Sequence, residues 1–153
     1  MKIPSPHSIL VIDEVPLIAV GMQEVFRCLN PSVQVEHSPG VFTALSAKIY
    51  EGKFFDLIIL GLQASCYPED LPQSVAGLKE RFGSSRIMVY TDRYDPLLIE
   101  KIKDWGIDAC VHKYETAEEI RNAYLRLSTG EAYVSGILHT MYYEYHVDLE
   151  KPV

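Results

Sequence analysis

The chain has 153 residues, of which 48% are hydrophobic and 23% charged, a composition typical of one globular domain and not of a disordered segment. Its 21 Asp and Glu outnumber its 14 Lys and Arg, giving a net charge of −7. This balance argues against direct nucleic-acid binding, because phosphate contacts need a basic face. The short N-terminal apolar run ends in two acids, so neither a signal peptide nor a membrane span is expected.

Strand-like and helix-like hydrophobic periods alternate along the sequence. In chain order they predict strand 8–12, helix 16–29, strand 33–37, helix 41–52, strand 56–60, helix 71–83, strand 86–91, helix 95–106, strand 109–112 and helix 116–130. Continuous apolar strands joined by helices indicate a parallel sheet covered on both faces. We therefore predict an α/β, flavodoxin-like, doubly wound sheet of five strands with helices on both faces.

Several residues mark where the predicted helices begin and end. Pro16 suits the first turn of a helix, and Gly52, Gly106 and Gly130 suit helix ends. Thr116, followed three residues later by Glu, predicts a capping box at the last helix. The cysteines Cys28, Cys66 and Cys110 lack the spacing of a zinc site, and we expect them to be reduced thiols in a cytoplasmic protein.

In a doubly wound sheet the functional site lies at the carboxyl ends of the strands. Four places meet this condition: the acidic pair Asp13 and Glu14, then Gly61, Thr91 and Lys113. No Gly-rich phosphate loop follows the first strand and no GxGxxG is present, so the sequence favours no cofactor-binding enzyme. We expect no cofactor, and we rank a small flavodoxin-like enzyme third among the possible functions.

The ordered set of strand-end residues resembles the receiver domain of two-component response regulators over about residues 8–135. The segments "ILVIDEVPLIAVGM" and "GIDACVHKYETAEEIRNAYLRLSTGEAYVS" are similar to the first and last parts of CheY-like receivers of the NarL/FixJ type, which precede a helix-turn-helix domain. The resemblance implies a CheY-like strand order of 2-1-3-4-5. It also implies a receiver-like domain at 1–135, with 136–153 as a C-terminal tail or the start of a linker.

The resemblance implies a specific chemistry at these positions. In a receiver, an aspartate at the end of the third strand attacks a phosphoryl group, with Mg²⁺ held by the acidic pair. Here Gly61 stands at that position and offers no carboxylate, so phosphorylation there is chemically impossible. Asp56 lies about 17 Å away at the other end of the strand. Asp92, Glu69 and Asp70 are interpreted as solvated or turn-forming acids.

The other receiver positions are partly altered. We favour an ion pair of Asp13 and Glu14 with Lys113 over a bound Mg²⁺. By resemblance, Thr91 and Lys113 bind phosphoryl oxygens; the alternative for Thr91 is a strand-terminal hydroxyl bonded to nearby backbone. Cys110 stands where many receivers carry a switching aromatic, which weakens the expectation of the usual switch.

Two surfaces are candidates for binding a protein partner or a second copy of the chain. The first is the 95–129 face, whose charged side chains are Glu100, Lys101, Lys103, Arg121 and Arg126. The second is the Tyr142–Tyr145 tail, in which Met141, Tyr142, Tyr143 and Tyr145 form an aromatic cluster. Such a cluster either packs on its own domain or forms an interface, and the sequence does not choose between these.

The sequence therefore indicates a degenerate receiver, or pseudo-receiver. We expect it to act in two-component or phosphorelay-type signal transduction as a protein-interaction module, without enzymatic activity and without direct nucleic-acid or membrane binding. The alternative is the N-terminal regulatory domain of a phosphorylation-independent helix-turn-helix transcription regulator.

Overall fold

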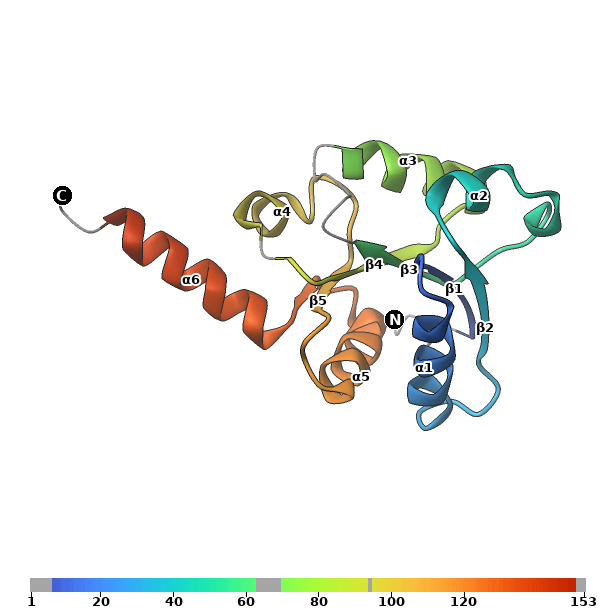
Figure 1. The fold of residues 1–153 in the computed structure, drawn as a ribbon, viewed down its shortest axis with the longest axis horizontal. Coiled ribbons are helices and arrows are strands. Elements are labelled where there is room, and N and C mark those ends of the chain that lie inside the picture. The colour runs from blue at the N-terminus through green and yellow to red at the C-terminus, as the bar shows by residue number, and fades with distance from the viewer. Residues whose placement is uncertain (1–6, 63–69, 94, 151–153) are drawn as a thin grey trace.

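The computed structural model describes residues 7–62, 70–93 and 95–150 of the chain, in which strands and helices alternate (Figure 1). The strands are β1 (Ser8–Ile12), β2 (Gln34–Ser38), β3 (Leu57–Leu62), β4 (Arg86–Thr91), β5 (Ala109–His112) and β6 (Tyr133–Val134). The α-helices are α1 (Pro16–Arg27), α2 (Val41–Ser46), α3 (Leu71–Phe82), α4 (Pro96–Lys101), α5 (Ala117–Arg126) and α6 (Gly136–Glu150). Two short 3₁₀ turns are η1 (Lys48–Tyr50) and η3 (Leu127–Thr129).

The strands form one sheet in the order β2-β1-β3-β4-β5-β6, and every neighbouring pair is parallel. The predicted doubly wound α/β architecture is confirmed, but the prediction of five strands was wrong. The sixth strand, β6, pairs with β5 through Ala109 opposite Tyr133 and Cys110 opposite Val134. Two residues are too few for an alternating pattern, so hydrophobic periodicity gives no signal for this strand.

Helices cover both faces of the sheet, with α1 and α5 on one face and α2, α3 and α4 on the other (Figure 1). Successive strand residues point to opposite faces, and both faces are buried. On β1, Leu10 packs into the core on the α2–α3 side, whereas Ile9 and Val11 pack on the α1–α5 side. This is why the central strands β1 and β3 have continuous apolar sequences, whereas the edge strand β2 is polar and only partly buried.

Several helices are shorter than predicted. The predicted 41–52 segment is split into α2 and η1, and the predicted 95–106 helix ends its regular part at Lys101. Gly52, Gly106 and Gly130 adopt φ values of 75°, 75° and 77°, the left-handed region that favours glycine. The segments therefore stop where predicted, but the preceding turns are not all α-helical.

The predicted capping box does not form. Thr116 stands at the N-cap of α5, but its side chain accepts no capping hydrogen bond. The carboxylate of Glu119 instead accepts a hydrogen bond from the Tyr133 hydroxyl of β6. A contact with a strand distant in sequence has replaced the local one, and it holds the new edge strand against α5.

Residues 136–150, the described part of the C-terminal segment, form α6, which extends from the end of the sheet beside α4 (Figure 1). Leu138 in its first turns is fully buried and contacts the core. Within the described ranges, no helix combines the length and hydropathy that a membrane span requires.

Candidate functional site

The carboxyl ends of adjacent strands bring the predicted site residues together at one edge of the sheet. Leu62, which follows Gly61 in β3, lies opposite Thr91 of β4. Asp13 directly follows β1, the strand on the other side of β3. Lys113 directly follows β5, and its backbone N–H donates to the carbonyl oxygen of Thr91 at 2.7 Å. Four residues far apart in sequence thus share one corner of the fold.

Asp13 is the buried charge of this corner. Its side chain is 0% exposed, and its Oδ2 lies 3.1 Å from Nζ of Lys113, whose side chain is 14% exposed. The other carboxylate oxygen, Oδ1, accepts a hydrogen bond from the backbone N–H of Val15 at 2.9 Å. The expected ion pair with Lys113 is therefore present for Asp13. Glu14 is exposed and has no ion pair among the residues that the structure describes.

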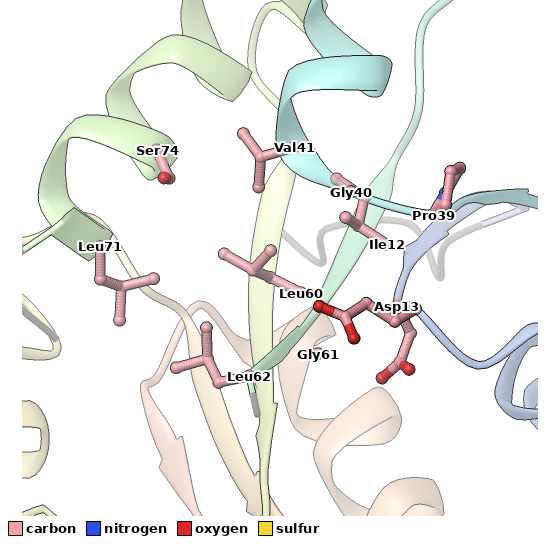
Figure 2. Close-up of a pocket in the computed structure, with 11 residues that line it drawn as sticks. Ile12, Asp13, Pro39, Gly40, Val41, Leu60, Gly61, Leu62, Leu71 and Ser74 are labelled. Carbon is pink, nitrogen blue, oxygen red and sulfur yellow. The ribbon is translucent and has the colours of Figure 1, made fainter. Parts of the chain in front are cut away.

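The carboxylate of Asp13 occupies the space that a side chain at residue 61 would need (Figure 2). A Cβ built on Gly61 would overlap Oδ2 of Asp13, would lie 2.8 Å from its Cγ, and would lie 3.1 Å from the carbonyl oxygen of Ile12. Real Cβ atoms do not approach other atoms so closely. The lack of a side chain at Gly61 therefore permits the Asp13–Lys113 geometry.

Lys113 is held by more than its carboxylate partner. Its Nζ also lies 5.6 Å from the ring centroid of Tyr90, on β4, close enough for a cation–π interaction. Burial, and secondarily the charge of Asp13, raise the pKa of the Tyr90 hydroxyl above its ordinary value. Tyr90 is thus a neutral phenol whose ring supports the ammonium group, and Lys113 is positioned toward Asp13.

The Thr91 hydroxyl is engaged locally. It accepts a hydrogen bond from the backbone N–H of Arg93 at 3.1 Å and donates to the carbonyl oxygen of the same residue at 3.3 Å. Thr91 is 2% exposed, so this turn accounts for the donor and acceptor of a buried hydroxyl. Its neighbour Asp92 is half-buried and stands outside the described lining of the cavity beside Gly61.

Cys110 lies in the middle of β5 and is fully buried, against Val89 on one side and Val134 on the other. Burial alone raises the pKa of its thiol to about 12. Cys110 is therefore a small, protonated core residue. It has no ring that could turn between a buried and an exposed position, which is the role that the resemblance implies for an aromatic there.

The residues present do not fit a receiver-type Mg²⁺ site. Mg²⁺ prefers hard oxygen ligands in octahedral geometry, but both carboxylate oxygens of Asp13 already accept from protein donors. Gly61 supplies no side-chain oxygen, and Glu14 alone remains. Across the described ranges no group of three or more His, Cys, Asp or Glu is placed to hold a metal ion. We therefore derive no chemistry through a metal here.

The substitute carboxylates that the sequence offers are not placed at the site. Asp56 precedes β3 at the opposite end of the sheet, where its Oδ2 accepts from the backbone N–H groups of His7 and Ser8, both at 3.0 Å. Asp70 is exposed at the N-cap of α3. Two further residues considered from the sequence, Glu69 and Cys66, lie outside the described residues.

The two candidate interaction surfaces meet one another. Glu100 of α4 accepts a hydrogen bond from the Tyr142 hydroxyl at 3.4 Å and lies 3.4 Å from Nε2 of His146. Tyr142 packs against the core, whereas Tyr143 is 70% exposed and Tyr145 is 40% exposed. The aromatic cluster therefore divides into a side that packs on its own domain and a side that faces solvent.

On the 95–129 face, Lys101, Arg121 and Arg126 form ion pairs with acids close in sequence, Asp104, Glu118 and Glu131.

Sequence reasoning missed one feature, a cavity of about 250 Å³ beside Gly61. Its walls come from the ends of β1 and β3, from the turn that begins α2, and from α3 (Figure 2). The residues missed are Pro39, Gly40, Val41, Leu71 and Ser74. The Pro39-Gly40 pair was a usable signal, since it directly follows β2 and so lies at the same edge of the sheet.

Comparison with known proteins shows the fold and not the family. No protein-family model matches the sequence, and no curated protein matches it. A solved structure of the RcsB response regulator from Salmonella typhimurium, described for its DNA interaction, has a TM-score of 0.71 at 14% identity, covering 92% of this chain and 67% of that chain.

Two further solved structures agree. The isolated REC domain of RcsB from Salmonella enterica serovar Typhimurium has a TM-score of 0.68 at 18% identity, covering 88% of this chain and 96% of that chain. A LuxR family DNA-binding response regulator from Silicibacter pomeroyi has a TM-score of 0.69 at 20% identity, covering 84% of this chain and 97% of that chain. The chain therefore has the fold of response-regulator receiver domains.

Proposed function

We propose that this chain is a pseudo-receiver, a cytoplasmic signalling and protein-interaction module of a two-component or phosphorelay-type pathway. It takes no phosphoryl group at residue 61 and catalyses no reaction. Its output depends on what binds it, not on an aspartyl phosphate. The support comes from the receiver-like fold together with a strand-end corner in which phosphate chemistry has been replaced by a buried ion pair.

One observation carries the proposal: the carboxylate of Asp13 occupies the place that the first side-chain carbon of an acceptor residue at position 61 would need. The nucleophile is absent at Gly61. The lysine that the resemblance assigns to a phosphoryl oxygen is already neutralised at 3.1 Å by Asp13. The hydroxyl assigned to the same task, on Thr91, is bonded to Arg93. Each of the three groups that would contact a phosphoryl group is either missing or occupied.

The test is incubation of the full chain with acetyl phosphate and Mg²⁺, followed by intact-mass measurement at neutral and acidic pH. We expect no adduct at the mass of one phosphoryl group. A receiver domain with an intact acceptor aspartate, treated in parallel, shows that the phosphodonor is active. A stoichiometric, acid-labile adduct on this chain would overturn the proposal, and peptide mapping would identify the carboxylate that carries it.

The protein-interaction part of the proposal rests on α6 and its neighbour α4. The solvent side of α6 presents Tyr143 and Tyr145, and aromatic side chains are enriched in protein interfaces. We propose that this side, continuous with α4 through Glu100, contacts a protein partner or a second copy of the chain. Sedimentation of the wild-type chain and of a Tyr143→Ser, Tyr145→Ser variant tests self-association. Chemical cross-linking in cells of origin tests a heterologous partner.

A second candidate function is the N-terminal regulatory domain of a phosphorylation-independent transcription regulator. It is favoured by the likeness to structures of DNA-binding response regulators and by the position of α6 directly after the sheet. Reading the coding sequence downstream of the codon for Val153 discriminates the two. A basic helix-turn-helix segment in the same frame would support this candidate, and a stop codon would exclude it.

A further inference from the structure

The cavity beside Gly61 lies where ligands bind in doubly wound sheets. The strand order 2-1-3 places β2 and β3 on opposite sides of β1, so the direction of winding reverses between β1 and β3. In such folds the crevice outside the carboxyl ends of the strands at this reversal is the general ligand position. The cavity, of about 250 Å³, is lined by the ends of those two strands, and its size suits a small molecule.

The walls of the cavity are mainly hydrocarbon. Leu60 and Leu62 extend from β3, Leu71 lies at the start of α3, and Val41 closes the side formed by α2 (Figure 2). Leu60, Leu62 and Leu71 are 2%, 5% and 1% exposed, so their positions are fixed by core packing. Burial of an apolar body against these fixed walls supplies the binding free energy that a small ligand needs.

The charged groups that line the cavity are acidic, so they favour a positively charged ligand over an anion. The described lining contains two carboxylates, Asp13 and Glu14, and one hydroxyl, Ser74, with no Lys, Arg or His. Lys113 neutralises Asp13 from outside this lining, which leaves the carboxylate of Glu14 without a cationic partner among the described residues. An anion entering the cavity would meet uncompensated negative charge and no free donor cation. An ammonium group would gain a charge-assisted hydrogen bond.

We infer that this cavity binds a small organic cation, a primary ammonium group carried on an apolar aliphatic or aromatic body. Glu14 at the rim binds the ammonium group, and the apolar body lies among Val41, Leu62 and Leu71. The inference rests on the proposed function in one respect, because the cavity is available for a ligand only if residue 61 carries no phosphoryl group. It supplies the proposed module with an input that does not require phosphate.

The experiment is a titration of the ¹⁵N-labelled full chain with three probes of similar shape: 2-phenylethylamine, 2-phenylethanol and 3-phenylpropionate. We expect saturable shifts of the Gly40, Val41, Gly61 and Leu62 amides with the amine, at a Kd on the order of 1 mM. The alcohol should bind about three- to five-fold more weakly, the cost of losing an exposed charge pair. The carboxylate should produce no saturable shift at these amides.

A Glu14→Gln variant isolates the charge contribution, since Glu14 is exposed and its replacement leaves the core intact. It should weaken the amine to the affinity of the alcohol and leave the alcohol unchanged. Glu144→Gln, an exposed acid-to-amide change on α6, is the matched control and should change neither. Absence of saturable shifts with the amine, equal or tighter binding of 3-phenylpropionate, or an unchanged amine affinity in Glu14→Gln would each overturn the inference. No phosphodonor is present, so this result is independent of the phosphorylation test.

Discussion

The corner of the sheet at Gly61 and the helix α6 hold charged groups in opposite ways. At the corner, Asp13 is 0% exposed and pairs with Lys113 across 100 residues of sequence. At the contact between α4 and α6, the carboxylate of Glu100 on α4 lies 3.4 Å from both the Tyr142 hydroxyl and Nε2 of His146 on α6, and the side chains of Glu100 and His146 are 43% and 39% exposed. The first pair has been taken out of water and must be satisfied by protein. The second joins two half-exposed side chains, although Nε2 of His146 is itself buried and has no hydrogen-bond partner among the described residues.

The difference separates a buried contact that the stability of the fold depends on, Asp13–Lys113, from a surface contact that the fold does not depend on, the one between α4 and α6. Removing one partner from a buried pair leaves an unpaired charge that water cannot reach. Removing the Glu100 charge from the α4–α6 contact leaves a partner, His146, whose side chain as a whole is 39% exposed. A surface that binds partners through α6 would need to rearrange easily, whereas the buried Asp13–Lys113 pair is fixed by its packing. Four predictions test this contrast.

Lys113→Met should cause the largest loss of stability. It keeps the hydrocarbon length of the side chain but leaves the fully buried carboxylate of Asp13 without its cation. We expect the free energy of unfolding to fall by about 3–5 kcal/mol, measured by urea denaturation at neutral pH. In an Asp13→Asn background the same change should cost much less, since no charge is left unpaired. A loss below about 1 kcal/mol in the wild-type background would mean that Asp13 is solvated.

Leu138→Ala should give the next largest loss of stability. It tests whether the start of α6 is packed as a core element while the rest of the helix is exposed. Leu138 is 0% exposed and contacts the core, so its truncation should cost about 2–4 kcal/mol of unfolding free energy. Tyr143→Ala, in a residue that is 70% exposed on the same helix, is the control and should change stability by less than about 0.5 kcal/mol. Equal effects of the two substitutions would contradict the division of α6 into a packed side and a free side.

Gly61→Ala tests the occupation of the acceptor position by Asp13. The added Cβ overlaps Oδ2 of Asp13, so the carboxylate must shift within its pair with Lys113, and we expect a loss of about 1–3 kcal/mol. In an Asp13→Ala background the overlap with the carboxylate disappears, the carbonyl oxygen of Ile12 stays at 3.1 Å, and the loss should shrink.

Gly61→Asp sharpens the same prediction. It restores a carboxylate but displaces Asp13, so it should not by itself give efficient phosphorylation with acetyl phosphate and Mg²⁺, as read by intact mass. If Gly61→Ala is as stable as the wild type, or if Gly61→Asp is phosphorylated stoichiometrically, the corner is looser than the structure indicates.

The strands and their ends were predictable because they depend on local sequence. Continuous apolar runs such as that of β1 report burial on both faces, and the carboxyl-end rule then brings Gly61, Asp13 and Lys113 together without coordinates. The sixth strand was not predictable, because two residues carry no period. The capping box at Thr116 failed for a related reason: Glu119 found a partner in Tyr133, which only the tertiary fold supplies.

The sequence predicted which residues lie at the site, but not how their side chains are arranged or that a cavity lies beside them. The absence of a carboxylate at residue 61 follows from the sequence alone, and so does the choice of Lys113 as partner for an acid. That Asp13 pairs with it while Glu14 stays exposed depends on side-chain direction after β1. The cavity depends on how α2 and α3 meet the sheet, and short irregular helices such as α2 leave a weak pattern in the sequence.

Glu100→Gln should give the smallest effect and completes the contrast. The amide keeps a hydrogen-bond acceptor for the Tyr142 hydroxyl but removes the charge near His146. Since the side chains are well exposed, global stability should change by less than about 0.5 kcal/mol.

Amide hydrogen exchange of residues 143–147 should accelerate by about two-fold as the far half of α6 leaves α4 more often, while amides of β1 and β3 remain unchanged. Glu144→Gln, on the exposed side of the same helix, should leave exchange as it is. Two results would contradict this prediction: exchange protection of residues 143–147 that does not change in Glu100→Gln, or a loss of global stability comparable to that of Lys113→Met. Either result would show that α6 is held as firmly as the Gly61 corner. Its aromatic side could then not be treated as an exchangeable binding surface.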